Sequence, residues 1–286
     1  MWGGWQLQRS PGIGKGRGSS SPFFIENIFE ELDSPGEWFL DTRSSTLYFI
    51  PPSGVNPNKA EIEAVVVKDL IRFLGTPERP VRNLILRGLT FTQSGLTFLD
   101  RYEPLGRGDW AIHRGGAVYF EGAENCRVED CRFEYVGGNA TFFSGYNRRN
   151  TVAHCRFSHT GDSGVAFAGL PKAVRMYLTW DDEEILEKSW EQMRRGMDMQ
   201  PGPKTPDYPG DCSVEDSVMS DIGDFGKQTA GVLISMSHRI RVSYCTIYNT
   251  PRAGICINDG TWGGHVIEHC DLWEAVRETG EHGPFN

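Results

Sequence analysis

A six-residue phrase that returns along the chain constrains its fold more than any other feature. Five clear copies and an earlier, degenerate copy occur at Val128–Phe133, Val152–Phe157, Val214–Met219, Val242–Ile247, Ile267–Leu272 and Leu86–Phe91. Measured at the fourth position, the spacing is 24 residues from Cys131 to Cys155 and 25 from Cys245 to Cys270. A repeat of this length is typical of a solenoid, in which each unit stacks on the previous one.

Each copy alternates apolar and polar residues, which indicates a strand with one buried face. A second alternating phrase precedes each copy, as at Val118–Gly122 and Val165–Gly169. The apolar spacing of two excludes a helical repeat, and the Leu-x-x-Leu-x-Leu signature of leucine-rich repeats is absent. We therefore predict an all-β fold, a parallel β-helix, with two strands per repeat and room for a short third one.

Stacking at strand spacing would align Cys131, Cys155, Ser217, Cys245 and Cys270 in one interior column. Neighbouring Cβ atoms about 4.8 Å apart exceed the disulfide range of about 3.5–4.5 Å, and the spacings match no zinc motif. The pattern favours buried free thiols packing as small apolar groups. Cys126 and Cys212 would share a second column, separated by one coil. We expect no disulfide framework, no metal and no cofactor.

Composition excludes several classes of protein. The chain has 286 residues, a net charge of −9 and no cluster of Lys and Arg, so a nucleic-acid partner is not expected. No apolar run is long enough to span a membrane, and the first residues lack the pattern of a signal peptide. We expect a monomer without a membrane partner.

The pattern divides the chain into three parts. Residues 1–22 are expected to be disordered, and residues 23–80 to form a β-rich region with a hairpin at 36–52. The β-helix is predicted over 81–286, interrupted by an insertion at 170–210 whose acidic start at Asp181 indicates a short helix. The sequence ends in what reads as the opening of another coil, so we expect a piece truncated at its C-terminus.

Stacked turns would place polar side chains in rows along one edge of the solenoid. One row reads Gly138, Asp162, Asp224, Arg252 and Arg277, and another reads Tyr135, His159, Asp221, Asn249 and Glu274. Taken singly, each is an ordinary turn residue. The gathering of several acids beside two arginines and Lys227 on one edge nevertheless favours a site.

Three carboxylates on this edge would suit the cleavage of glycosidic bonds, in which one acid protonates the leaving oxygen and another attacks the sugar or activates water. The candidates are Asp224, Asp259 and Glu281. Their spacing by coils fits both a retaining separation of about 5 Å and an inverting one of about 9 Å. The candidate substrate-binding residues are Asp221, Lys227, Arg252, Trp262, His265, Glu278 and His282.

The chain resembles the right-handed parallel β-helix proteins of glycoside hydrolase family 141 over about residues 24–286. The matching segments are Asn27–Asp33, Pro35–Asp41, Arg87–Thr92, Arg107–Trp110, Arg114–Val118, Lys227–Val232, Pro251–Ile255, Asp259–His265 and Glu278–Asn286. The resemblance implies an extracellular or periplasmic enzyme that acts on plant-type polysaccharide, by removing fucose or cleaving xylan. The chain departs from the family in carrying Glu281 where an Asp is usual and in lacking a following Trp-Gly-Arg-Asp segment.

Two other functions remain open. A polysaccharide lyase on the same fold would use Arg252 or Lys227 to neutralise a uronate carboxylate, although the negative net charge ranks it lower. A non-catalytic glycan-binding or adhesin module is the other, because a fold by itself does not define an activity.

Overall fold

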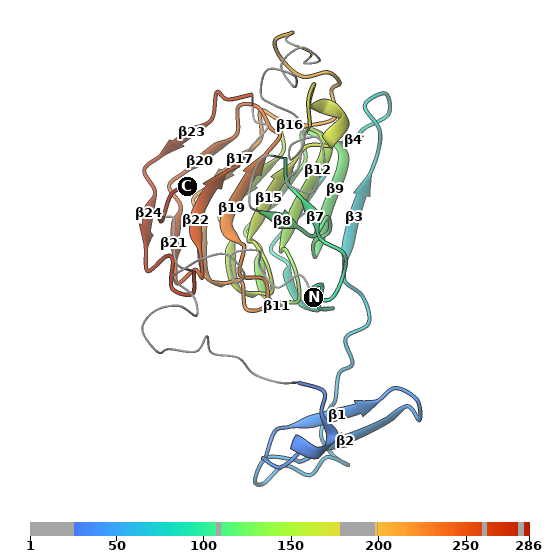
Figure 1. The fold of residues 1–286 in the computed structure, drawn as a ribbon. Helices are drawn as coiled ribbons and strands as arrows, with labels where there is room; N and C mark the ends of the chain where they lie inside the picture. Colours follow the sequence, from blue (N-terminus) through green and yellow to red (C-terminus); the bar gives the residue numbers. More distant parts are fainter. Residues whose placement is uncertain (1–25, 107–109, 178–197, 199, 259–261, 280–282) are drawn as a thin grey trace, which may run out of the picture.

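The computed structural model describes residues 26–106, 110–177, 198, 200–258, 262–279 and 283–286. The regular secondary structure of these residues is almost entirely β: stacked parallel strands form three sheets, in an arrangement consistent with a parallel β-helix (Figure 1). We number these sheets 1 to 3 in the order in which each coil enters them. Successive strands of the chain belong to sheets 1, 2 and 3, and the next strand then pairs with its equivalent in sheet 1.

Each sheet takes one strand from each successive coil. Sheet 1 contains β3 (Ile71–Leu74), β9 (Val118–Glu124), β12 (Thr141–Arg148), β15 (Val165–Ala168), β19 (Ala230–Ser235) and β22 (Ala253–Ile257), with β4 (Val81–Arg82) on β9 and β16 (Pro209–Gly210) on β12. Sheet 2 contains β5 (Ile85–Arg87), β10 (Arg127–Glu129), β13 (Thr151–Ala153), β17 (Ser213–Glu215), β20 (Arg241–Ser243) and β23 (Val266–Glu268). Sheet 3 contains β6 (Thr90–Ser94), β11 (Arg132–Val136), β14 (Arg156–Thr160), β18 (Val218–Ile222), β21 (Thr246–Tyr248) and β24 (Asp271–Trp273).

The recurring phrase is a corner between two strands, which corrects its interpretation as a single strand. In Val128–Phe133, β10 ends at Glu129 and β11 begins at Arg132. Of the two residues between them, Asp130 and Cys131, the first has a φ of 53°. Alternation survives across the bend because each short strand keeps one side chain pointing inward.

The same left-handed conformation marks the corners of the coils. Positive φ angles are found at Asn125, Arg149, Asp211 and Arg239 between sheets 1 and 2; at Asp130, His154, Asp216, Tyr244 and His269 between sheets 2 and 3; and at Gln93, Tyr135, His159, Asp221, Asn249 and Glu274 between sheets 3 and 1. The last set contains the predicted row from Tyr135 to Glu274. Asn, Asp and His adopt this conformation more readily than other non-glycine residues, which explains their frequency at these corners.

The cysteine column is confirmed. Backbone hydrogen bonds link the coils at this position, from Arg156 N to Cys131 O and from Asp271 N to Cys245 O. All seven cysteines are free, and all but Cys270 are buried. In the second column, Asn150 lies between Cys126 and Cys212, because Thr151 N donates to Cys126 O and Ser213 N to Asn150 O.

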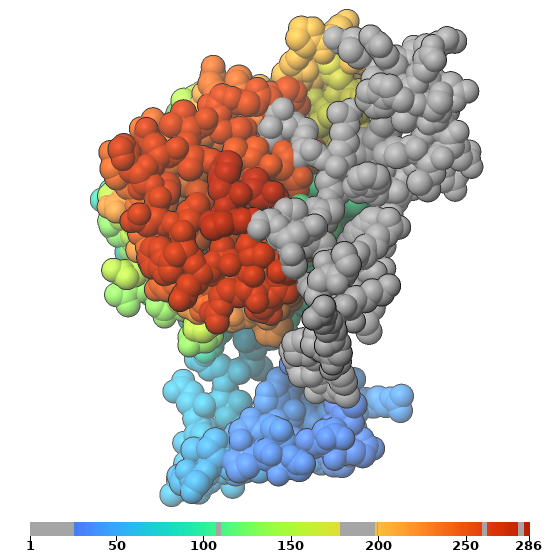
Figure 2. Space-filling view, turned by 60° about the vertical axis from the view of Figure 1, so that its left-hand side comes forward, coloured from blue at the N-terminus to red at the C-terminus, as the bar shows by residue number. Residues whose placement is uncertain are grey.

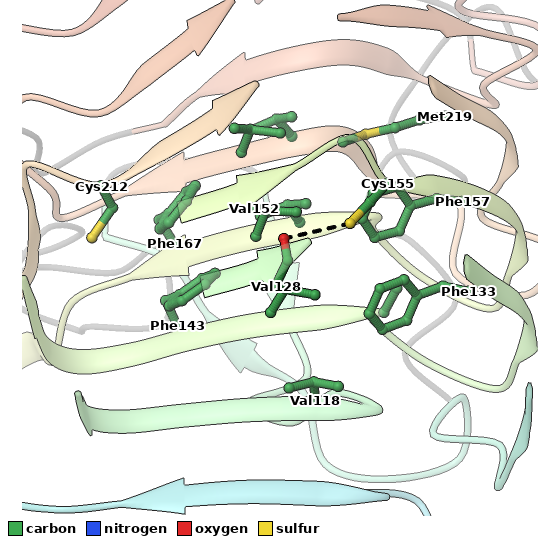
Figure 3. Packing of buried hydrophobic residues seen from close by; sticks show 14 of the residues in the cluster. Val118, Val128, Phe133, Phe143, Val152, Cys155, Phe157, Phe167, Cys212 and Met219 are labelled. Atoms are coloured by element: carbon green, nitrogen blue, oxygen red, sulfur yellow. Dashed lines mark hydrogen bonds between the residues drawn. The ribbon is translucent and has the colours of Figure 1, made fainter. Parts of the chain in front are cut away.

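Each thiol in the main column also has a polar role. Cys155 Sγ lies 3.2 Å from the carbonyl oxygen of Ala153, across the corner, and 3.6 Å from that of Val128 in the preceding coil (Figure 3). Ser217 makes the equivalent corner bond through its hydroxyl, 2.8 Å from Glu215 O. A small side chain with one donor is therefore what this position requires, and Cys and Ser both provide it.

Aromatic ladders fill the rest of the interior. Phe143 stacks between Phe120 and Phe167 at ring-centroid distances of 4.5 and 4.8 Å. On sheet 3, Phe133 stacks on Phe157 at 4.8 Å. These contacts follow from the in-register pairing of parallel strands, which places identical positions above one another.

The remaining elements lie outside the coils. The 3₁₀ turn η1 (Phe29–Glu31) precedes β1 (Trp38–Asp41) and β2 (Thr46–Phe49), which pair as the predicted antiparallel hairpin. This hairpin stands apart from the coils (Figures 1 and 2). In the predicted β-rich region over 23–80, residues 61–70 form no strand, and the coils begin at β3, before residue 81. A second 3₁₀ turn, η2 (Pro171–Ala173), opens the insertion, whose predicted helix at Asp181 lies outside the described residues.

Residues 93–106 and 110–116, the described parts of the 93–116 segment, leave sheet 3 and cross the outer face of sheet 1. They include a short antiparallel pair, β7 (Glu103–Pro104) and β8 (Ala111–Ile112). Leu105, Trp110 and Ile112 are buried there against the outward side chains of sheet 1, such as Tyr119 and Phe142. No helix within the described residues has the length and apolar character needed to cross a membrane.

Replacement of Cys155 tests the requirement for a small donor at the corner. We expect Cys155→Ser to change the free energy of unfolding by less than about 1 kcal/mol. Cys155→Val should destabilise by about 1–3 kcal/mol, because it adds volume to a packed column and removes the donor. Urea unfolding followed by circular dichroism measures both. Equal losses for the two variants would contradict the role of the thiol as a donor.

The thiols should also be unreactive in the folded protein. Burial raises the pKa of Cys155 and of Cys245 to about 12, so hardly any thiolate is present at neutral pH. Treatment with iodoacetamide followed by mass spectrometry should leave the six buried cysteines unmodified, whereas unfolding without reductant should expose all seven. Fewer than seven labels after unfolding would reveal a disulfide and contradict the column of free thiols.

Candidate functional site

The corner between sheets 3 and 1 carries the densest group of predicted site residues. Asp221 lies near the end of β18, Asp224 follows this strand, and Lys227 lies on the same loop as Asp224, just before β19. The next coils add Arg252 before β22 and Glu278 after β24. We call Asp221, Asp224, Lys227 and Glu278 the corner cluster.

The loop from Gly223 to Thr229 holds the corner cluster against the preceding coil. Its backbone is fixed by hydrogen bonds from Asp224 N to Thr160 O and from Gly226 N to Gly161 O. Gly223 has a φ of 80°, and a Cβ there would lie 2.7 Å from Gly226 O, so only glycine fits this tight turn. The loop therefore presents Asp224 at a fixed position on the edge.

Asp224 is half exposed and pairs with a histidine of the preceding coil. Its Oδ2 lies 3.4 Å from His159 Nδ1, and the side chains are 39% and 40% exposed. Burial raises the pKa of Asp224, and neighbouring Asp221 raises it further, whereas His159 and Lys227 lower it. A carboxyl whose pKa is raised in this way holds a proton at higher pH than a free aspartate, which suits a general acid.

Lys227 connects two coils of the corner. Its ammonium group lies 3.0 Å from the Glu278 carboxylate and donates to Gly223 O at 2.9 Å. Asp221, in turn, accepts a hydrogen bond from the Asn249 side chain. These contacts span three coils, from β18 to the turn after β24, and make the corner cluster one connected surface.

Arg252 belongs to the same corner but is fully buried. Its guanidinium carbon lies 4.2 Å from the centre of the Trp110 ring, which the 93–116 segment brings across the sheet. The same segment is fixed nearby by a hydrogen bond from Ala111 N to the Gln228 side chain, at 3.2 Å. Trp110 and Gln228 thus lie beside the candidate site, although the strand pattern alone did not identify them.

Trp262 and His265 do not share the edge of the corner cluster. Both follow β22, at the carboxyl end of sheet 1, whereas Asp224, Lys227 and Arg252 precede its strands. The five residues of β22 separate the two ends by about 16 Å. Trp262 packs against Tyr208, with ring centroids 4.7 Å apart. His265 accepts a hydrogen bond from Ile240 N inside the corner, and burial lowers its pKa.

The other three predicted residues, Asp259, Glu281 and His282, lie outside the described residues. Within the part of the chain that the structure describes, no three His, Cys, Asp or Glu side chains gather closely enough to hold a metal ion.

The structure also reveals a buried carboxyl beneath the corner cluster. Asp162 is 4% exposed, and its Oδ2 accepts a hydrogen bond of 3.0 Å from the hydroxyl of Tyr102. Burial raises the pKa of Asp162 to about 6. The sequence places Asp162 in the right row, but its partner Tyr102 comes from a segment whose path no periodicity predicts.

Comparison with known proteins gives one informative likeness. No family model matches the chain, and no curated protein matches it. A solved structure named "Glycoside hydrolase" has a TM-score of 0.61 with this chain at 18% identity. The match covers 82% of this chain and 41% of that one, so the chain spans less than half of the protein it resembles. At this identity the likeness concerns the fold.

Removal of His159 should shift the titration of Asp224. His159 lowers the pKa of Asp224, so His159→Gln should raise it and leave the carboxyl protonated to higher pH. NMR of protein labelled with ¹³C at the aspartate carboxyls measures this pKa. The matched control is His154→Gln. At another corner, His154 Nδ1 lies 2.9 Å from Asp216 Oδ2, so this variant removes a similar partner from a different aspartate. An unchanged Asp224 titration in His159→Gln would contradict the pairing.

Proposed function

We propose that this chain is the β-helical part of a glycoside hydrolase and that it acts on polysaccharide at the corner between sheets 3 and 1. The observation that carries the proposal is Asp224, a half-exposed carboxyl of raised pKa fixed on a connected polar corner. The fold likeness to a protein named a glycoside hydrolase supports it.

In this proposal Asp224 is the general acid that protonates the leaving glycosidic oxygen. Its raised pKa favours the protonated form, and His159 beside it can take up and return the proton. The second carboxylate, which attacks the sugar or activates water, is Asp259 or Glu281. Lys227 and Glu278 bind sugar hydroxyls beside Asp224. The separation of the two carboxyls determines the stereochemical outcome.

Trp262 has a different place in this proposal. It lies about one strand length, roughly 16 Å, from the corner cluster. A substrate that touches both would run parallel to the strands of sheet 1, outside the layer that covers them, and be longer than a single sugar. This geometry favours an oligosaccharide or polysaccharide, with Trp262 offering an aromatic face to a distant sugar ring.

The sequence resemblance supplies the narrower part of the proposal. It supports membership of glycoside hydrolase family 141, a plant-type polysaccharide as substrate, an extracellular or periplasmic location, and a monomer. The roles given to His265, Asp221, Arg252 and His282 as substrate-binding residues belong to the same proposal. Of these, Arg252 is fully buried and His265 accepts a hydrogen bond from Ile240 N, so we expect both to act by shaping the site.

The contacts of Lys227 and Arg252, the two cations that a lyase would use, argue against a lyase. Lys227 is already paired with Glu278, and Arg252 is buried against Trp110. Neither presents an exposed positive charge to a uronate carboxylate. A non-catalytic glycan-binding module remains the second candidate, because the corner cluster would bind sugar hydroxyls with or without turnover.

Activity should depend on Asp224. We expect the chain to release oligosaccharides from plant cell-wall glycans and Asp224→Asn to lower the rate by about 10²–10⁴-fold, because the general acid is lost. Chromatography with mass spectrometry identifies the products, and an unsaturated sugar end would instead indicate a lyase. Asp216→Asn, at the corresponding Asp–His pair of another corner, is the control and should retain activity.

Two results would decide against the hydrolase. Full activity in Asp224→Asn would remove Asp224 from the mechanism. Binding of a glycan by the unaltered chain, with no product after long incubation, would support the binding module in place of the enzyme.

A further inference from the structure

The segment that covers sheet 1 is fastened to the coils at two separate points. We call residues 97–106 its first arm and residues 110–116 its second arm. The second arm is anchored by Arg114, whose guanidinium donates to Ser144 Oγ at 2.9 Å and to the carbonyl oxygens of Ala168 and Gly169. Arg114 also pairs with Glu103. A guanidinium stays charged over the whole range in which the protein is folded, so this anchor does not respond to pH.

The first arm has a different fastening. Tyr102 donates its hydroxyl to Asp162 at 3.0 Å and lies 3.4 Å from Thr97 Oγ1. Among the described residues of the first arm, only the Tyr102 side chain donates a hydrogen bond to the carboxyl of a coil residue. Asp162 itself is buried between this arm and the loop that carries Asp224.

That loop lies directly on the Asp162 carboxyl. A Cβ on Gly226 would be 3.3 Å from Asp162 Cγ, and Gly226 N donates to the neighbouring Gly161 O. Asp162 thus contacts Tyr102 on one side and the backbone between Asp224 and Lys227 on the other. One carboxyl joins the covering segment to the candidate site.

Few charges surround Asp162. Tyr102 faces it from the first arm, with Asp100 beyond, and Asp100 is already paired with Lys68 and His113. From the loop, Asp224 and Lys227 flank Gly226. Ser163 donates a backbone and a side-chain hydrogen bond from the same corner. No ion pair to Asp162 occurs among the described residues, so an ionised Asp162 would be a buried charge held only by neutral donors.

We infer that Asp162 is a positioning residue of the candidate site, a proton-dependent latch whose neutral form fits the buried contact between the first arm and the loop of Asp224. Loss of the proton places a charge in this buried contact. Water can reach and solvate that charge only if the first arm loosens.

The direction of the pH effect follows from the shift of Asp162. Its pKa is about 6 in the folded protein and 3.8 when solvated. The docked arm therefore binds the proton more tightly than the loosened arm. Docking of the first arm onto the coils is strongest at pH values below 3.8. It weakens as the pH rises through 6 and is constant above that. At pH 8 the equilibrium should favour loosening by up to about 100-fold more than at acidic pH.

Hydrogen–deuterium exchange tests this latch without any substrate. Exchange is followed at pH 5 and pH 8, corrected for the intrinsic pH dependence of amide exchange, in peptides from the two arms. In the unaltered chain we expect faster exchange of residues 97–102 at pH 8. We expect little change in residues 103–106 and 110–116, because the β7–β8 pair and the Glu103–Arg114 ion pair join them to the Arg114 anchor. Asp162→Asn keeps the shape of the neutral acid and should make the first arm equally protected at both pH values.

Two further variants separate the latch from general loosening. Tyr102→Phe removes the donor and should increase exchange of the first arm at both pH values. Tyr146→Phe removes a tyrosine that donates to Glu124 on another part of the coils, at 2.5 Å, and should leave the arm unchanged. The inference fails if Asp162→Asn keeps the pH dependence of the unaltered chain, or if the unaltered chain shows none.

A consequence for activity rests on the proposed function. If the chain hydrolyses glycans, the high-pH side of its pH–rate profile should extend further in Asp162→Asn than in the unaltered chain. The exchange experiment stands without this measurement, so a chain that lacks hydrolase activity can still confirm or overturn the latch.

Discussion

The corner of each coil is the constraint on which the rest of this fold depends. A single residue in the left-handed region turns the chain from one sheet to the next, at a cost of about 1–2 kcal/mol for a non-glycine residue. The carbonyl before the bend, such as Ala153 O or Glu215 O, accepts a backbone hydrogen bond from the neighbouring coil and has a second lone pair to satisfy. The thiol or hydroxyl that follows, as in Cys155 and Ser217, donates to this carbonyl and is small enough to stack between coils. The same backbone bend and the same side-chain hydrogen bond therefore recur at the equivalent corner of successive coils.

Repetition of the corner has a consequence for function. Because the strands are in register, a side chain at a given corner position always lies one coil from its equivalents. Pairs such as His159 with Asp224, or His154 with Asp216, arise from this geometry without any special backbone arrangement. What distinguishes the corner between sheets 3 and 1 is its longer loop at 223–229, which partly buries Asp224 and shifts its pKa upward.

The sequence predicted the repeating part of the fold and little of what covers it. The column of thiols and the row from Tyr135 to Glu274 follow from spacing alone, because stacking leaves only one way to align equal positions. The corner within Val128–Phe133 was missed because two short strands alternate like one longer strand. The Trp110–Arg252 and Tyr102–Asp162 contacts could not be predicted, because the 93–116 segment has no period and meets its partners across 60 residues or more. The candidate site was predicted in part for the same reason: Asp221, Asp224, Lys227 and Glu278 belong to the repeat, whereas Trp262 and His265 emerge at the other end of sheet 1.

The outer face of sheet 1 explains why the covering segment and the site occur together. Sheets 2 and 3 turn polar or charged side chains outward, such as Arg241 paired with Glu268, and need no cover. Sheet 1 instead turns Tyr119, Phe142 and Leu233 outward, so a second layer must bury them. That layer ends at the corner cluster, where the apolar cover meets the charged edge. A carboxyl at such a boundary is partly desolvated, as Asp224 is, or fully desolvated, as Asp162 is. The raised pKa values of both therefore follow from the need to cover one sheet of the three.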